Sequence, residues 1–221
     1  MRLLLILFAF PRSAMVADKP ATATCDMPIE MVDSYFTISP IRSMQESDQT
    51  EKLRGGRVAY LGLGSNLGDR AANLVRAISN LIAANLHLHA LSSIYETEPV
   101  DYLEQPRFLN MVVAVTGNQL DPFSLLDFCL ETERRLGRQR TIPRGERTID
   151  IDLLMLDDLI IDVLGDSNRL TLPHPRMHMR RFVLTPMDEI APDLRHPVSG
   201  KTMSQLLDAL DDSSAVKVYL D

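Results

Sequence analysis

Hydrophobic residues along this chain first form a regular pattern near residue 57. The segment RVAYLGLG (57–64) predicts a β-strand, and the turn-forming residues after it lead to Asp69, a residue type favoured at a helix N-cap. Between residues 71 and 84 the apolar positions recur at helical spacing, which predicts an amphipathic helix. We therefore place the start of the folded domain at residue 57.

Apolar residues continue to recur at strand or helix spacing up to residue 156. The predicted elements are an extended segment at 86–99, a strand at 107–115, a helix at 121–136, a strand at 148–156 and, later, a helix at 203–210. Proline in the first turn and Gly137 after the last turn delimit the helix at 121–136. The order strand, helix, strand, strand, helix, strand predicts an α+β, ferredoxin-like fold, an antiparallel sheet with helices packed on one face, plus C-terminal additions.

Residues 1–56 show no sustained period, so we expect a poorly ordered N-terminal extension before a domain at 57–221. The apolar start and the A-x-A at 21–23 resemble a secretory signal, although the apolar run is too short to span a membrane. Alternatively, the working protein starts at a later methionine, nearer Met27, Met31 or Met44.

Charge narrows the class of ligand. The net charge of −7 argues against a general nucleic-acid or anionic-membrane binder, which usually needs a basic surface. Arginines nevertheless cluster between residues 134 and 147 and again between 176 and 181. Such clusters in an acidic protein suggest a small polyanionic ligand, with solvated surface charge as the alternative. The presence of only two cysteines makes a disulfide framework unlikely and fits a reducing compartment.

The strand TIDIDLLML (148–156) carries the first candidate site. Asp150 and Asp152 share one face, about 6.6 Å apart along the strand, so both could reach one divalent ion or a pair of ions. Oxygen ligands suit Mg²⁺. The alternative is a solvated polar face on an amphipathic strand.

Two further segments suggest a site for a flat, charged ligand. In the strand at 107–115, Phe108 and Asn110 share a face, where an aromatic ring could stack on a heterocycle and an amide could read its edge; a core phenylalanine is the alternative. His174 lies between two prolines in an arginine-rich segment, which favours phosphate contact. The turn GLGSNLGD (62–69) fits neither the Walker A nor the Rossmann spacing, and its simplest interpretation is a tight strand-to-helix turn.

Several motifs in order make one resemblance specific. They are LGLGSNLGDR, SSIYETEPV, QPRFLNMVV, ETERRLGRQR, GERTIDIDLLML and LPHPRMHMRRFVLTPMDEIAPDL. From about Val58 to Leu207 the chain resembles the 6-hydroxymethyl-7,8-dihydropterin pyrophosphokinase family of folate biosynthesis. The resemblance implies a ferredoxin-like enzyme that transfers the terminal pyrophosphoryl group of ATP to the hydroxymethyl oxygen of the pterin and releases AMP. It also implies two Mg²⁺ ions, with ATP as co-substrate.

The resemblance assigns roles to residues at matching positions. It implies that Asp150 and Asp152 hold both metal ions and that Arg138 and Arg147 act on the transferring phosphates. It implies that Phe108 and Phe182 sandwich the pterin while Asn110 and the Thr97 segment read its edges. The implied ATP contacts are Glu133, Arg140, Arg169, Thr171, His174 and Arg180. The departures from the family pattern are Leu130, Arg144, Glu146 and Met179.

This resemblance also sets the expected partners and location. We expect ATP and a reduced pterin as partners, no nucleic acid and no membrane, and a monomer. Cytosolic or organellar supplies of these substrates favour a cytoplasmic protein, with an organellar address left open. Two other functions remain as alternatives: a non-catalytic, ferredoxin-like nucleotide-binding module, and a two-metal nucleotidyltransferase that would release pyrophosphate.

Overall fold

The computed structural model describes residues 56–100, 103–117, 120–138, 145–164 and 169–220. Nearly all of the predicted N-terminal extension lies outside these ranges, so its expected disorder stays a prediction. None of the helices in the described ranges combines the length and the apolar character needed to span a bilayer.

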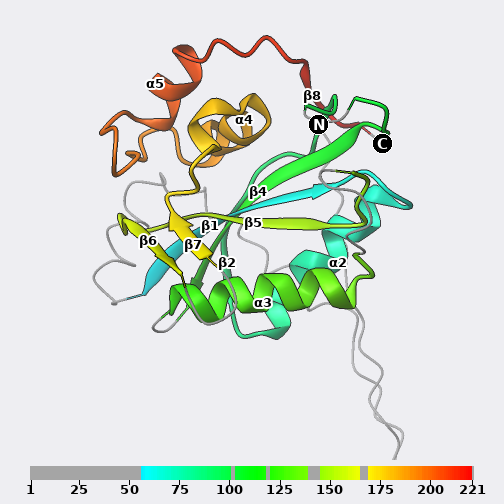
Figure 1. Cartoon of the computed structure of the whole chain (residues 1–221), viewed down its shortest axis with the longest axis horizontal. Helices are drawn as coiled ribbons and strands as arrows, with labels where there is room; N and C mark the ends of the chain where they lie inside the picture. Colours follow the sequence, from blue (N-terminus) through cyan, green and yellow to red (C-terminus); the bar gives the residue numbers. More distant parts are fainter. Residues whose placement is uncertain (1–55, 101–102, 118–119, 139–144, 165–168, 221) are drawn as a thin grey trace, which may run out of the picture. The chain divides into compact units, whose positions relative to one another are not determined.

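The elements follow the predicted order and add several that the sequence did not predict (Figure 1). They are β1 (Arg57–Ser65), α2 (Arg70–Ala83), β2 (His87–Leu91), β3 (Tyr95–Thr97), β4 (Phe108–Gly117), α3 (Pro122–Arg135), β5 (Asp150–Leu156), β6 (Ile161–Leu164), β7 (Arg169–Leu172), the short 3₁₀ helix η1 (Met177–Met179), α4 (Arg181–Ile190), α5 (Met203–Asp208) and β8 (Val216–Val218).

A six-stranded antiparallel sheet organises the described residues. The strand order is β5-β1-β4-β3-β8, and β2 also pairs with β4, so the predicted extended segment at 86–99 forms two short strands. β6 and β7 form a separate hairpin. In the central rows of the sheet, Gly64 of β1 pairs with Asn110 of β4 and with Asp150 of β5. Neighbouring residues in such a row share one face, so the register brings the predicted amide and carboxylate to the same side of the sheet.

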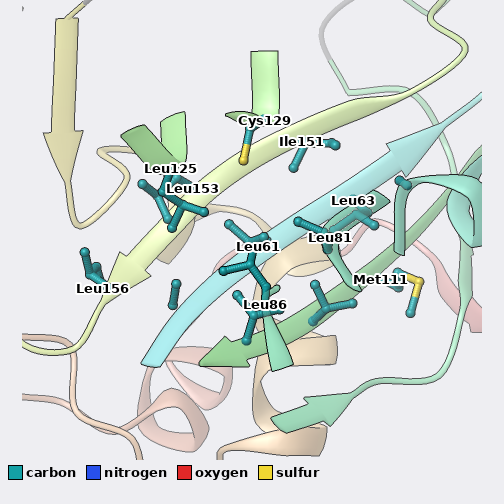
Figure 2. Packing of buried hydrophobic residues seen from close by; sticks show 14 of the residues in the cluster. Leu61, Leu63, Leu81, Leu86, Met111, Leu125, Cys129, Ile151, Leu153 and Leu156 are labelled. Atoms are coloured by element: carbon teal, nitrogen blue, oxygen red, sulfur yellow. The ribbon is translucent and has the colours of Figure 1, made fainter. Parts of the chain in front are cut away.

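Two of the predicted helices, α2 and α3, cover one face of the sheet (Figure 1). Their starts are fixed as expected: Asp69 accepts a hydrogen bond from the Ala72 N–H at 3.0 Å, and Asp121 accepts one from the Ser124 N–H at 2.7 Å. Figure 2 shows apolar side chains from the strands and helices meeting here, among them Leu61. The α+β, ferredoxin-like prediction is confirmed.

The C-terminal additions cover the opposite face. α4 and α5 pack on Tyr60, Val112 and Leu154, so β1, β4 and β5 are covered on both faces. The α5 helix was predicted, whereas no helix was predicted for the segment that forms α4. Apolar residues at helical spacing in α4 bury against the sheet despite Pro186 within the helix. This second apolar layer places the start of α4 beside the two aspartates.

Candidate active site

A cavity of about 430 Å³ opens on the α4 face of the sheet. Its floor is backbone, because β1 carries Gly62 and Gly64 at the two positions that follow Tyr60 on this face. A Cβ added at Gly64 would lie 2.7 Å from Asn110 Oδ1, which is closer than such atoms approach in proteins. Glycine at position 64 therefore leaves room for the amide and for a ligand above the strand.

One half of the cavity presents aromatic rings and an amide. Asn110, which is 8% exposed, donates a hydrogen bond from Nδ2 to Thr97 Oγ1 at 2.7 Å. Phe108 comes from the start of β4, and Phe182 comes from the first turn of α4; both line the cavity. The fixed amide beside two rings can read the edge of a flat heterocycle that stacks on them.

The other half is strongly charged. Asp150 forms ion pairs with Arg138 and Arg147, and Asp152 Oδ2 lies 3.9 Å from Arg180 Nη1. Two of these arginines also reach the aromatic half: the guanidinium of Arg147 lies 5.6 Å from the Phe108 ring centroid, and that of Arg180 lies 5.3 Å from the Phe182 ring centroid. The charged and aromatic halves are therefore joined.

The pKa values of the two aspartates shift in opposite directions. Burial alone would raise the pKa of Asp150, but the guanidinium groups of Arg138 and Arg147 outweigh burial and lower it. For Asp152, burial and then the charge of Asp150 raise the pKa to about 6, although Arg180 acts in the other direction. Positive charge brought by a ligand would favour the carboxylate form of both.

Glu133 does not line the cavity, although the resemblance implies an ATP contact for it. The residue lies on α3 and is 3% exposed, and its side chain accepts hydrogen bonds from the Ile151 N–H at 2.8 Å and from Arg138. Burial raises the pKa of Glu133 to about 7, with Arg138 opposing the rise. Its contacts support the start of β5 and hold Arg138 beside Asp150.

His174 lines the cavity as a neutral imidazole. Burial, followed by the charges of Arg180 and Arg176, lowers the pKa of His174 to about 4. Its Nδ1 accepts a hydrogen bond from the Arg176 N–H at 3.2 Å, so the neutral ring carries its proton on Nε2. The His174 N–H donates to Leu154 O at 2.8 Å, which fixes the loop against β5.

Two predicted nucleotide contacts lie outside the cavity. Arg169 and Thr171, on β7, do not line the cavity; both contact Asp162, Arg169 through two hydrogen bonds of 3.0 and 2.8 Å and Thr171 through one of 3.0 Å. Arg140 lies outside the described residues. Sequence reasoning did not single out Gln105 or Arg176 as individual ligand contacts, yet both line the cavity. Both residues lie within motifs that carry the family resemblance, Gln105 in QPRFLNMVV and Arg176 in LPHPRMHM, and this position could have identified them.

The donor set fits magnesium bound together with a substrate. Among the described residues, no group of three or more histidine, cysteine or carboxylate side chains could form a metal site. Mg²⁺ commonly binds proteins through one or two carboxylates, while substrate phosphates and water complete its coordination. Asp150 and Asp152, on one face of β5, offer two such carboxylates.

Comparison with known proteins agrees with this geometry. A family model described as 7,8-dihydro-6-hydroxymethylpterin-pyrophosphokinase matches residues 60–192. Two bacterial relatives are called 2-amino-4-hydroxy-6-hydroxymethyldihydropteridine pyrophosphokinase. The one from Methylorubrum extorquens is 42% identical over 72% of this chain and 98% of its own length. The one from Bacillus subtilis is 40% identical over 67% of this chain and 86% of its own length.

Longer relatives contain a similar region. The chain is 34% identical, over 92% of its own length, to a Schizosaccharomyces pombe protein named folic acid synthesis protein fol1, and it spans only 27% of that protein. A solved structure of Plasmodium falciparum HPPK-DHPS with pteroate superposes with a TM-score of 0.55 at 18% identity, over 69% of this chain and 42% of that one, which shows the likeness of fold. With both the sequence match and the fold in agreement, the chain belongs to the 7,8-dihydro-6-hydroxymethylpterin-pyrophosphokinase family.

Proposed function

We propose that this cavity transfers the pyrophosphoryl group of ATP to the hydroxymethyl oxygen of 6-hydroxymethyl-7,8-dihydropterin, giving AMP and the pterin diphosphate. The family and its named relatives support this step of folate biosynthesis. One observation carries the proposal. In a single cavity, the half with aromatic rings and an amide directly adjoins the half that contains Asp150, Asp152 and several arginines.

The aromatic half orients the acceptor. We assign stacking of the pterin to Phe108 and Phe182 and recognition of its edge to Asn110 and Thr97. Because Nδ2 of Asn110 is committed to Thr97 at 2.7 Å, its Oδ1 is held in one orientation and can accept a hydrogen bond from a ring N–H or amino group. A pterin fixed in this way directs its hydroxymethyl group toward the charged half, which lowers the entropy cost of in-line attack.

The charged half binds and neutralises the phosphates. Transfer spreads negative charge over phosphate oxygens, so fixed cations stabilise the transition state without a large rearrangement. We assign Arg138 and Arg147 to this role, and we propose that Asp150 and Asp152 hold two Mg²⁺ ions, which would supply further neutralisation of the phosphates. Asp150 could also accept the departing proton. Glu133 supports the site by holding Arg138.

The remaining assignments concern the nucleotide. We propose that Arg140, Arg169, Thr171, His174 and Arg180 contact ATP. The first lies outside the described residues, and contact by Arg169 and Thr171 would require exchanging their bonds to Asp162 for bonds to nucleotide. We also infer a monomer. The net charge of −7 argues against a nucleic-acid partner. The supply of ATP and reduced pterin inside cells favours a cytoplasmic location, with an organellar one as the alternative.

A product assay tests the function. The chain is incubated with ATP, Mg²⁺ and the hydroxymethyl pterin, and AMP, ADP and pyrophosphate are resolved. We expect pterin-dependent AMP, lost in Asp152→Ala while thermal unfolding still shows a folded protein. Pyrophosphate release without AMP would favour a nucleotidyltransferase. Substrate binding without any turnover would favour a non-catalytic module.

A further inference from the structure

We propose that Asn66 is a positioning residue that holds the two halves of the cavity in register, by tying Arg147 to the segment that precedes Phe108. The proposal rests on the proposed function, because it assigns a purpose to the GLGSNLGD turn that this function leaves unexplained. Asn66 does not line the cavity and is 2% exposed; it directly follows β1. It therefore acts through other residues.

The first set of contacts holds the main chain of Arg147. Asn66 Oδ1 accepts a hydrogen bond from the Arg147 N–H at 2.8 Å, and the Asn66 N–H donates to Arg147 O at 3.1 Å. This reciprocal pair fixes the backbone from which the Arg147 side chain reaches both Asp150 and the Phe108 ring. A shift of the Arg147 backbone would move a cation of the charged half directly.

The second set of contacts holds the aromatic side of the cavity. Asn66 Nδ2 donates to Gln105 Oε1 at 3.1 Å and to Pro106 O at 3.2 Å. Gln105 lines the cavity, and Pro106 lies two residues before Phe108. The same amide that holds Arg147 thus also holds the chain leading into the aromatic wall.

The chemistry of an amide explains why this residue type stands here. The side chain offers an acceptor oxygen and two N–H donors, and all three are used by groups from two distant segments. A carboxylate could accept from Arg147 but could not donate to Pro106 O. A buried apolar side chain would leave these polar groups without that partner.

Asn73 provides a matched control for the loss of a buried amide. It lies in the first turn of α2, is 7% exposed, and donates from Nδ2 to Ser65 Oγ at 3.3 Å and to Leu67 O at 3.0 Å. These bonds stabilise the same turn but reach neither Arg147 nor Gln105. A variant at this position should destabilise the turn without separating the two halves of the cavity.

The experiment compares Asn66→Ala with Asn73→Ala in steady-state kinetics, in pterin binding without ATP, and in thermal unfolding. We expect both variants to unfold at lower temperature. We expect Asn66→Ala alone to lose at least tenfold in kcat and at least tenfold in pterin affinity. Equal kinetic and binding losses in the two variants would overturn the proposal, because they would indicate a general effect of a loosened turn.

Asn66→Asp separates the two sets of contacts. The carboxylate keeps an acceptor for the Arg147 N–H and lacks a donor for Pro106 O, so we expect this variant to retain more of kcat than of pterin affinity. The opposite order would overturn the assignment of the contacts. The charge state of the carboxylate is controlled by repeating the binding measurement at two pH values above 6.

A measurement on the unaltered chain covers the case in which the variants do not fold. Hydrogen exchange at the Arg147 amide should be slow, because that N–H is bonded to buried Asn66; exchange at the rate of an exposed amide would overturn the proposal. Absence of AMP from the unaltered chain would refute the proposed function instead. Pterin binding and amide exchange would still report on Asn66.

Discussion

Glycine at position 64 should be required for pterin recognition rather than for folding. In Gly64→Ala the new Cβ would lie 2.7 Å from Asn110 Oδ1, and the cheapest relief is a rotation of the amide. That rotation breaks the 2.7 Å bond from Asn110 Nδ2 to Thr97 and turns the acceptor away from the ligand. The perturbation thus acts on the amide that we assign to the pterin edge.

The expected magnitude follows from those bonds. A net hydrogen bond contributes about 1 kcal/mol, and a buried polar group left without a partner costs about 1–3 kcal/mol. A loss of about 1.4 kcal/mol corresponds to roughly tenfold weaker binding, so we expect pterin affinity to fall by at least about tenfold. Stability should change less, because alanine is more favourable than glycine within a strand by about 0.5–1 kcal/mol, which offsets part of the strain.

Gly62→Ala is the matched control. Its Cβ would meet Leu154 Cδ1 at 3.4 Å, close to ordinary van der Waals contact, and would not touch the amide. The assay is titration of each purified variant with the pterin, by calorimetry or ligand fluorescence, alongside urea unfolding. The reasoning is refuted if Gly64→Ala binds the pterin as tightly as Gly62→Ala does, or if its weaker binding is matched by an equal loss of folding free energy.

Three further predictions concern buried or paired groups. Burial alone would raise the pKa of Asp212, but its hydrogen bonds, including that from the Arg181 N–H, lower it. The advantage of the native chain over Asp212→Asn in urea unfolding, about 1 kcal/mol at pH 7 for a carboxylate at a helix N-terminus, should therefore decline as the pH falls below the ordinary pKa of an aspartate. For Glu133, burial raises the pKa to about 7, so stability relative to Glu133→Gln should fall as pH rises from about 4 to about 7, and a difference independent of pH would contradict this. Burial also raises the pKa of the Cys129 thiol to about 12, so in a Cys25→Ala variant a disulfide reagent at pH 8 should modify Cys129 only after urea is added.

Elements that bury one face with a regular period were predictable from sequence. The strands at β1, β4 and β5 and the helices α2 and α3 carry that period, and Asp69 and Asp121 cap the helices as their residue types indicate. The α4 helix escaped because Pro186 and the nearby arginines argue for a loop, whereas its apolar residues have a helical period that only packing on the sheet makes decisive. β8 is too short to show any period.

Some features of the site were also predictable from sequence, and others were not. Alternation along a strand was enough to put Asp150 beside Asp152, and Phe108 beside Asn110, on shared faces. It could not give the strand order, so the row from Asp150 through Gly64 to Asn110 became visible only in the sheet register. Side-chain hydrogen bonds were also hidden: the bonds that Glu133 accepts from the Ile151 N–H and from Arg138 became visible only in the structure.

The pairing of β8 with β3 has a consequence for how the cavity is completed during synthesis. Thr97 lies on β3, opposite Val216, while Asp212 accepts a hydrogen bond from the Arg181 N–H at 3.0 Å, next to Phe182. Two parts of the aromatic half of the cavity, β3 and the start of α4, are therefore held by residues 212–218, which leave the ribosome after every catalytic group has been made. A nascent chain can bury α2 and α3 against the sheet early, but it gains a shaped substrate site only after residues 212–218 have also left the ribosome.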